Sequence, residues 1–154
     1  MDTFITGLRA IAESLSGNPR FFHEKEAVMN RETGGASAEE YIVFAPALGS
    51  GTVNKTGNGF RVMQTVMIEF VKRCEYGASI SEASDPVKQQ TNIDLMFDKA
   101  IEFMQILNNS VVFEHPTRFD MVYVYDTFDD NYSGILITFD LTLKQPLSLC
   151  APTS

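Results

Sequence analysis

An acidic cluster lies between two β-like runs near the end of the sequence, in VYVYDTFDDNYSGILITFDL. Its carboxylates, Asp126, Asp129 and Asp130, are of the type that binds hard cations. A calcium loop needs about six oxygen ligands, from alternating acidic residues, a central glycine and a distal glutamate. The order D-T-F-D-D-N-Y-S-G lacks that alternation, and no His or Cys lies nearby to complete a transition-metal site. We therefore interpret Asp126 to Gly134 as a hairpin turn, with a metal site or a partner-binding loop as alternatives.

The histidines and cysteines form no recognisable nucleophilic or metal-binding motif. His23 lies in a charged run and His115 precedes a proline, so we expect both on the surface. The sequence contains no GxSxG, and Cys74 ends a predicted strand rather than starting a helix. Cys74 and Cys150 match no CxxC spacing, and we expect two free thiols near strand ends, with one bridge as the alternative.

The glycine-rich segment 49–59, GSGTVNKTGNG, could suggest a phosphate-binding loop. Such loops have the spacing GxxxxGK[ST] or GxGxxG and connect a strand to a helix. Segment 49–59 connects two predicted strands and lacks that spacing, so we predict a mobile loop or long hairpin turn. The carboxylate pairs Glu24/Glu26 and Glu39/Glu40 lie in solvated segments. We therefore expect no catalytic residue, no cofactor and no metal.

Composition favours one globular domain over residues 1–154. Apolar residues make up 44% and charged residues 21%, which are ordinary globular values. The net charge of −8 argues against sequence-specific nucleic-acid binding, which depends on Lys and Arg neutralising phosphates. The N-terminus lacks the pattern of a signal peptide, and no run approaches about 18 apolar residues. We expect a protein made in the cytoplasm, with no membrane partner.

Two helices are predicted from apolar residues at helical spacing. Residues 2–16 form the first, and the triplet Gly17-Asn18-Pro19 ends it. Thr91 and Asp94 resemble a capping box, which predicts a second helix over about 92–108. Asn108 and Asn109 would end that helix, since Asn tolerates the left-handed conformation. Its apolar stripe comprises Ile93, Met96, Phe97, Ala100, Met104 and Leu107.

Strands are predicted from period-two alternation at 41–45, 60–74 and 135–143, with an interrupted strand over 110–128 that breaks near Pro116. One face of the long strand 60–74 is apolar: Phe60, Val62, Val66, Ile68 and Phe70. Its other face is mixed: Arg61, Met63, Thr65, Met67, Glu69, Val71 and Arg73. In 135–143, odd-numbered residues are apolar and even-numbered ones are mixed.

These elements predict an α+β fold, in which a mostly antiparallel sheet has two helices packed on one face as a two-layer sandwich. Both strand faces then carry apolar residues, more than one small domain needs. Such a surface is typical of association, with a second layer formed by segment 19–46 as the alternative. The candidate oligomer interface is Met63, Met67, Val71, Met121, Tyr123, Tyr125, Thr52, Val53 and Asn54.

The order of elements, with a glycine-rich loop and the ending D-N-Y-S-G…F-D-L-T-L…P-L-S-L-C, resembles tail-terminator and tail-completion (neck) proteins of tailed bacteriophages and prophages. The resemblance implies a virion structural protein without catalytic residues, forming a homo-oligomeric ring, often hexameric, at the head-tail junction. Its partners would be other tail or neck proteins, and DNA would pass through the lumen. Segment 19–46 departs from the family pattern. The alternative is a small-molecule-binding or enzymatic α+β domain with Asp140 or His115 facing inward.

Overall fold

The structure is a computed structural model that describes residues 2–23, 41–46, 51–56, 59–74, 86–127 and 132–144. It is α+β, with a mixed sheet and two helices in these ranges. Asp129, Asp130, Cys150 and the pairs Glu24/Glu26 and Glu39/Glu40 lie outside the described residues. The elements are α1 (Asp2–Glu13), β1 (Arg20–Phe22), β2 (Tyr41–Phe44), β3 (Gly51–Thr56), β4 (Gly59–Arg73), α3 (Pro86–Asn108), β5 (Phe119–Thr127) and β6 (Tyr132–Thr142).

Helix α1 ends at Glu13, three residues earlier than predicted. The chain changes direction at the Gly17-Asn18-Pro19 triplet that was predicted to end the helix. The backbone N–H groups of Ser14 and Leu15 donate to the carbonyls of Ile11 and Ala12, which closes the last turn. Gly17 and Asn18 follow, with φ angles of 91° and 47°. These left-handed conformations are accessible to Gly and Asn at low cost, which explains why the chain turns here toward β1.

Helix α3 begins at Pro86, well before the predicted start at 92. Thr91 lies inside the helix, and its hydroxyl donates to the carbonyl of Val87 at 2.9 Å, one turn earlier. The capping-box prediction was therefore wrong. Proline suits the first turn of a helix because its missing N–H would have no helical partner there. The predicted end at Asn108 is confirmed, and the Asn109 side chain donates to the carbonyl of Gln105.

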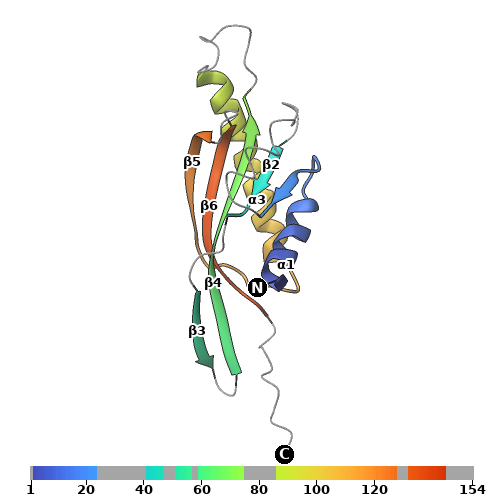
Figure 1. Ribbon diagram of the computed structural model, residues 1–154, viewed down its shortest axis with the longest axis vertical. Helices are drawn as coiled ribbons and strands as arrows, with labels where there is room; N and C mark the ends of the chain where they lie inside the picture. The colour runs from blue at the N-terminus through green and yellow to red at the C-terminus, as the bar shows by residue number, and fades with distance from the viewer. Residues whose placement is uncertain are drawn as a thin grey trace, which may run out of the picture.

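The sheet has the order β1-β2-β4-β6-β5, and β3 pairs with β4 outside this path (Figure 1). Only β1 and β2 run parallel; the other described pairs are antiparallel. The described parts of segment 19–46 supply β1 and β2 at one side of this path, and the strand predicted at 41–45 is confirmed as β2. On the other side β5 is the edge strand of the described sheet, and it is nine residues long.

Strand β4 is the longest strand and has partners on both sides. Its ladder with β6 runs from Met63↔Thr142 to Arg73↔Tyr132. On its other side, β2 pairs with residues 69–72 and β3 with residues 59–64. The first residues of β4 thus pair with β3 alone, and the two strands extend as a ribbon beyond the body of the molecule (Figure 1).

The prediction that 49–59 is a loop was wrong for most of its length, because Gly51–Thr56 forms β3. Main-chain pairing with β4 does not require apolar side chains, so composition did not reveal this strand. The ladder closes at Thr56↔Gly59, and the two residues between them lie outside the described part. A hairpin was one of the two predicted alternatives, and the observed turn is shorter than expected.

The interrupted strand over 110–128 is also corrected. Residues 110–115 contribute only an isolated bridge between Phe113 and Leu143, and β5 starts at Phe119. The terminal hairpin itself is confirmed, since β5 and β6 pair up to Thr127↔Tyr132. Asp126 and Gly134 lie inside the strands rather than in the turn, and the register shifts between Val124 and Thr127.

The main hydrophobic core joins α1 and α3 to one face of the sheet, which we call the helix-side face. That face includes Val66, Ile68 and Phe70 of β4, and the alternation predicted for β4 is confirmed there. A smaller cluster on the opposite face consists of Ile42, Phe44, Val71 and Tyr132, with Phe22 and Val124 packed against it. No helix in the described ranges has the length and apolar character needed to cross a membrane.

Two phenylalanines on α3 provide a matched test of this core. Phe103 is fully buried and packs edge-to-face on Phe70 with ring centroids 5.4 Å apart. Phe97 was predicted on the apolar stripe but is 41% exposed, so the stripe prediction was wrong for this residue. We expect Phe103→Ala to lower the free energy of unfolding by about 3–5 kcal/mol, because it leaves a cavity. The control Phe97→Ala should cost less than about 1 kcal/mol. Urea unfolding measures both, and equal losses would contradict the core assignment.

Candidate functional site

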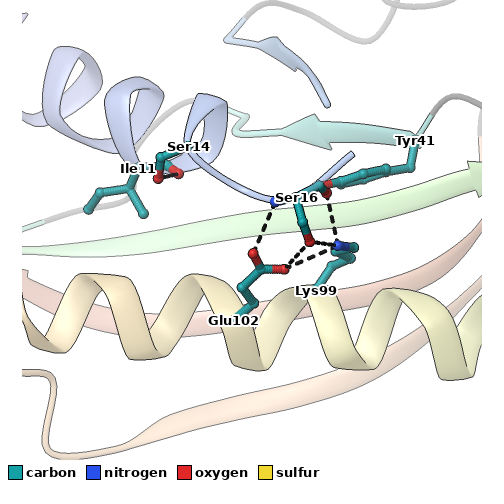
Figure 2. A network of polar contacts seen from close by, with 6 residues as sticks. All are labelled: Ile11, Ser14, Ser16, Tyr41, Lys99 and Glu102. Atoms are coloured by element: carbon teal, nitrogen blue, oxygen red, sulfur yellow. Dashed lines mark hydrogen bonds and ion pairs between the residues drawn. The ribbon is translucent and has the colours of Figure 1, made fainter. Parts of the chain in front are cut away.

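A cluster of polar side chains joins the end of α1 to α3 and β2 (Figure 2). It contains Ser16, which follows α1, Lys99 and Glu102, which lie one turn apart on α3, and Tyr41 of β2. No pattern in the sequence predicted this cluster. The one available signal was the spacing of Lys99 and Glu102, which favours an ion pair along a helix.

Ser16 is bonded to α3 through three of its atoms. Its backbone N–H donates to Glu102 Oε1 at 3.0 Å, and its hydroxyl donates to Glu102 Oε2 at 2.9 Å. Lys99 Nζ donates to the Ser16 carbonyl at 2.8 Å, contacts the Ser16 hydroxyl and pairs with Glu102 Oε2 at 3.1 Å. The Tyr41 hydroxyl donates to the same Ser16 carbonyl at 2.7 Å. Just before it, the Ser14 hydroxyl donates to the Ile11 carbonyl.

This environment fixes the protonation of two groups. Partial burial acts to raise the pKa of Glu102, but the hydrogen bonds from Ser16 and the charge of Lys99 outweigh it and lower the pKa below its ordinary value. Burial, followed by the negative charge of Glu102, raises the pKa of the Tyr41 hydroxyl. Glu102 is therefore a carboxylate at neutral pH and Tyr41 a protonated donor.

A serine next to a lysine could suggest nucleophilic catalysis, but the geometry favours a structural role. Every polar partner of Lys99 Nζ is an acceptor, which suits an ammonium with three hydrogens. A general base would instead need a free lone pair directed at the serine hydroxyl. The hydroxyl of Ser16 donates to Glu102, which holds the turn after α1 against α3.

A second polar cluster lies at the end of β4, around Cys74. Asn92 of α3 is 9% exposed, and its amide donates to the carbonyls of Lys72 and Arg73 at 3.3 and 3.2 Å. The Cys74 thiol is buried, free and near Asn92 and Ser133. The prediction of a free thiol near a strand end is confirmed for Cys74. Because Asn92 donates to backbone carbonyls of the last two residues of β4, this cluster fastens α3 to the sheet.

The residues first considered for metal or acid-base chemistry lie apart. Among the described residues, no three His, Cys, Asp or Glu side chains are grouped so as to hold a metal ion. His115 is exposed, but His23 is only half-exposed and its Nδ1 lies 2.7 Å from the Ala45 carbonyl. His23 is therefore partly buried at the surface, where it links the segments that follow β1 and β2. Asp140 is exposed and accepts a hydrogen bond from Thr65 at 2.7 Å.

The predicted interface residues do not form one surface, because the sheet divides them. Met63 and Met67 are half-buried on the face opposite the helices, and Thr52 pairs with Met63 at the start of the ribbon. Val71 is fully buried in the smaller cluster, so we remove it from the candidate surface. Val53 and Asn54 lie in β3 opposite Val62 and Arg61.

The other three predicted residues lie on β5, at the far edge of the sheet. Met121 and Tyr123 are registered with Ile137 and Ile135 and therefore share the helix-side face, not the face of Met67. Met121 packs against the main core. Tyr125 lies where the β5–β6 register shifts. The sequence could not assign these faces, because the assignment depends on the register between strands.

Strand β5 displays a band of large exposed apolar side chains, which we call the β5 strip: Phe119, Val122, Tyr123 and Tyr125, at 37, 58, 54 and 51% exposure. Phe119 and Tyr123 are registered with Phe139 and Ile135, on the helix-side face. Val122 is registered with Leu136 and lies on the opposite face. The edge of β5 that has no partner among the described strands is thus bordered by apolar side chains on both faces of the sheet.

The polar cluster around Ser16 predicts a pH dependence. Because the folded pKa of Glu102 is lowered, its contribution to stability is present above the unfolded pKa and is lost as the pH falls through the folded pKa. We expect Glu102→Gln to cost about 0.5–1.5 kcal/mol of unfolding free energy near pH 7, after allowance for solvent screening. The deficit should shrink as the pH falls below the pKa of an unfolded glutamate, about 4.3, and vanish once the pH is below the lowered folded pKa.

Urea unfolding from pH 3.5 to 7 measures this deficit. The matched control is Asp98→Asn on the exposed side of the same helix, which removes one carboxylate outside the polar cluster. A Glu102→Gln deficit that is constant across the pH range, or that Asp98→Asn reproduces, would contradict the role of the Glu102 charge.

No family model matches the sequence. No curated protein matches it either. Function is therefore inferred from the surfaces described above, together with the resemblance in element order and sequence ending.

Proposed function

We propose that this chain is a structural virion protein of a tailed bacteriophage or prophage, which forms a ring at the head-tail junction or at the tail end. The observation that carries the proposal is the outer edge of β5, which pairs with no other described strand, is nine residues long and is bordered by the β5 strip. In this proposal the helices and sheet form a two-layer, tail-terminator-like sandwich, and the chain acts by assembly rather than by catalysis.

A long apolar edge is a hazard for a monomer. Its unpaired N–H and C=O groups are a template for another strand, and proteins usually protect such edges with short strands, prolines or inward-pointing charges. Strand β1, at the other end of the main strand order, is only three residues long. Strand β5 lacks proline and is three times as long, which supports a partner on that edge in the assembled state.

The two ends of the sheet are unlike, and this favours a ring over a two-fold dimer. One side presents the β5 edge, and the other presents β1 and, off the main path, the β3–β4 ribbon. Contacts between unlike surfaces are head-to-tail, and they close into rings when the rotation between subunits permits. A net charge of −8 suits a lumen through which DNA slides without binding.

The alternative is a small-molecule-binding or enzymatic domain with a pocket between sheet and helices. Its candidate groups were Asp140 and His115 facing inward. Both are exposed, and Asp140 lies on the face opposite the helices, paired in register with Thr65. The polar groups that do lie between α1, α3 and β2 are bonded to one another. We therefore prefer assembly as the function.

Light scattering of the purified chain, combined with negative-stain electron microscopy, tests the proposal. We expect a discrete oligomer whose mass is an integer multiple of 17.2 kDa, and ring-shaped particles in projection. Closure explains the discrete size, because a head-to-tail contact that does not close gives filaments. A strict monomer up to roughly millimolar concentration, where even weak contacts form, would overturn the proposal.

The genes that flank the coding sequence give an independent check. Capsid, connector and tail-tube genes on either side are the expected result, because virion proteins that meet at the neck are encoded together in the proposed role. Metabolic genes on both sides would contradict the virion role, even for a chain that assembles into rings.

A further inference from the structure

We propose that the β3–β4 ribbon of one copy adds its β3 edge to the β5 edge of a neighbouring copy. We call the ribbon, β3 with residues 59–62 of β4, the arm. This inference rests on the proposed self-assembly and names the surfaces that would meet. The partner is therefore a second copy of this chain, joined by main-chain hydrogen bonds between strands.

The arm has a free edge directed away from its own sheet. Strand β3 pairs with β4 alone among the described strands, and the arm extends beyond the body of the molecule (Figure 1). With two residues between Thr56 and Gly59, the closing pair exchanges hydrogen bonds and the pattern alternates from there. The N–H and C=O groups of Val53 and Lys55 consequently point outward.

The β5 edge is long enough to pair with all of β3, and it carries the apolar side chains that β3 lacks. The added strand β3 has six residues, and β5 has nine, so β5 can pair with all of it. Strand β3, GTVNKT, contributes one large apolar residue. The apolar contact would instead come from the β5 strip, since Tyr123 and Val122 border the edge on opposite faces and would cover an added strand from both sides.

The charges of the two segments are complementary. In a chain of net charge −8, the charged residues of segment 51–62 are Lys55 and Arg61, both basic. Those of β5 are Asp120 and Asp126, both acidic. Opposite charge steers two surfaces together and selects the register in which they meet. The arm is thus a basic strand edge, and β5 is an acidic one.

The same charges disfavour the competing arrangement, in which β5 of one copy pairs with β5 of another. An antiparallel β5–β5 pair centred on Tyr123 would place Asp120 opposite Asp126 at both ends. Like charges directly opposite each other destabilise a strand pair. Pairing of the arm with β5 avoids this repulsion.

Two variants, each with one damaged surface, test the inference by complementation. Val53→Pro removes an outward N–H of the arm and leaves the hydrogen-bonded pairs with β4 in place. Val122→Lys with Tyr123→Lys places positive charges along the β5 edge. Val111→Lys is the matched control, since Val111 is 85% exposed and lies outside the strands. Lys55→Glu is a second arm variant that retains every backbone donor.

We expect each damaged variant alone to associate at least about tenfold more weakly than wild type, measured by sedimentation, and the control to associate normally. An equimolar mixture of Val53→Pro with the β5 double variant should form one-to-one dimers that grow no further, because one intact arm and one intact edge remain. Lys55→Glu should weaken association and reduce its dependence on salt.

Other outcomes separate the two proposals. Normal rings from both Val53→Pro and Lys55→Glu would overturn pairing of the arm with β5 and leave the ring proposal standing. Loss of association in the β5 variant alone would indicate β5–β5 pairing instead. Weak association of Val53→Pro supports pairing of the arm with β5 only if its urea midpoint matches that of wild type, because the variant is then as stable as wild type. If that midpoint falls, Lys55→Glu alone decides the role of the arm.

Discussion

The antiparallel ladder between β4 and β6 is the constraint on which the other elements depend. It fixes which residues of each strand share a face, from Met63↔Thr142 to Arg73↔Tyr132. The two backbones approach closely near Val71↔Gly134, where a Cβ on Gly134 would lie 1.9 Å from the Phe70 carbonyl oxygen. Gly134 therefore permits this ladder. With the register set, Ile68 and Ile137 must point to the helices, and Val71 and Tyr132 must point away from them.

The two ends of β4 differ in how many strands and side chains pack against them. The second half of β4 has strand partners on both sides and buried side chains on both faces. The residues that begin β4 have β3 as their one described strand partner. A two-stranded ribbon without packing on a face is marginal by itself. In the proposed assembly, the edge of a neighbouring β5 would give this ribbon a third strand.

The sequence predicted elements with strong periodicity and failed where structure depends on pairing. The alternation of Val66, Ile68 and Phe70 and the stripe of α3 were sufficient to predict a long strand and a long helix. Strand β3 was missed because its ladder uses backbone groups that composition does not report. The start of α3 was misplaced because Thr91 bonds one turn back, as Thr does inside helices as well as at caps.

The faces of the predicted interface residues also could not be assigned from sequence, because they depend on strand pairing. Alternation made Met67, Met121 and Tyr123 candidate interface residues, but the alternation within one strand does not show which face of the sheet each residue is on. Only the registers Met67↔Thr138 and Tyr123↔Ile135 show that these residues point to opposite sides of the sheet. The polar cluster around Ser16 was beyond prediction, since it joins a turn, a helix and a strand that are distant in sequence.

The division of apolar residues between the two faces also constrains how copies can meet. A flat contact on one face would cover Val122 or Tyr123, and leave the other exposed. A strand added at the β5 edge lies between the faces, so its side chains reach residues on both. Edge pairing is thus the contact geometry that accounts for exposed apolar groups on opposite sides of a single strand. It also satisfies the backbone groups of that edge, which a contact made through side chains on one face would leave to water.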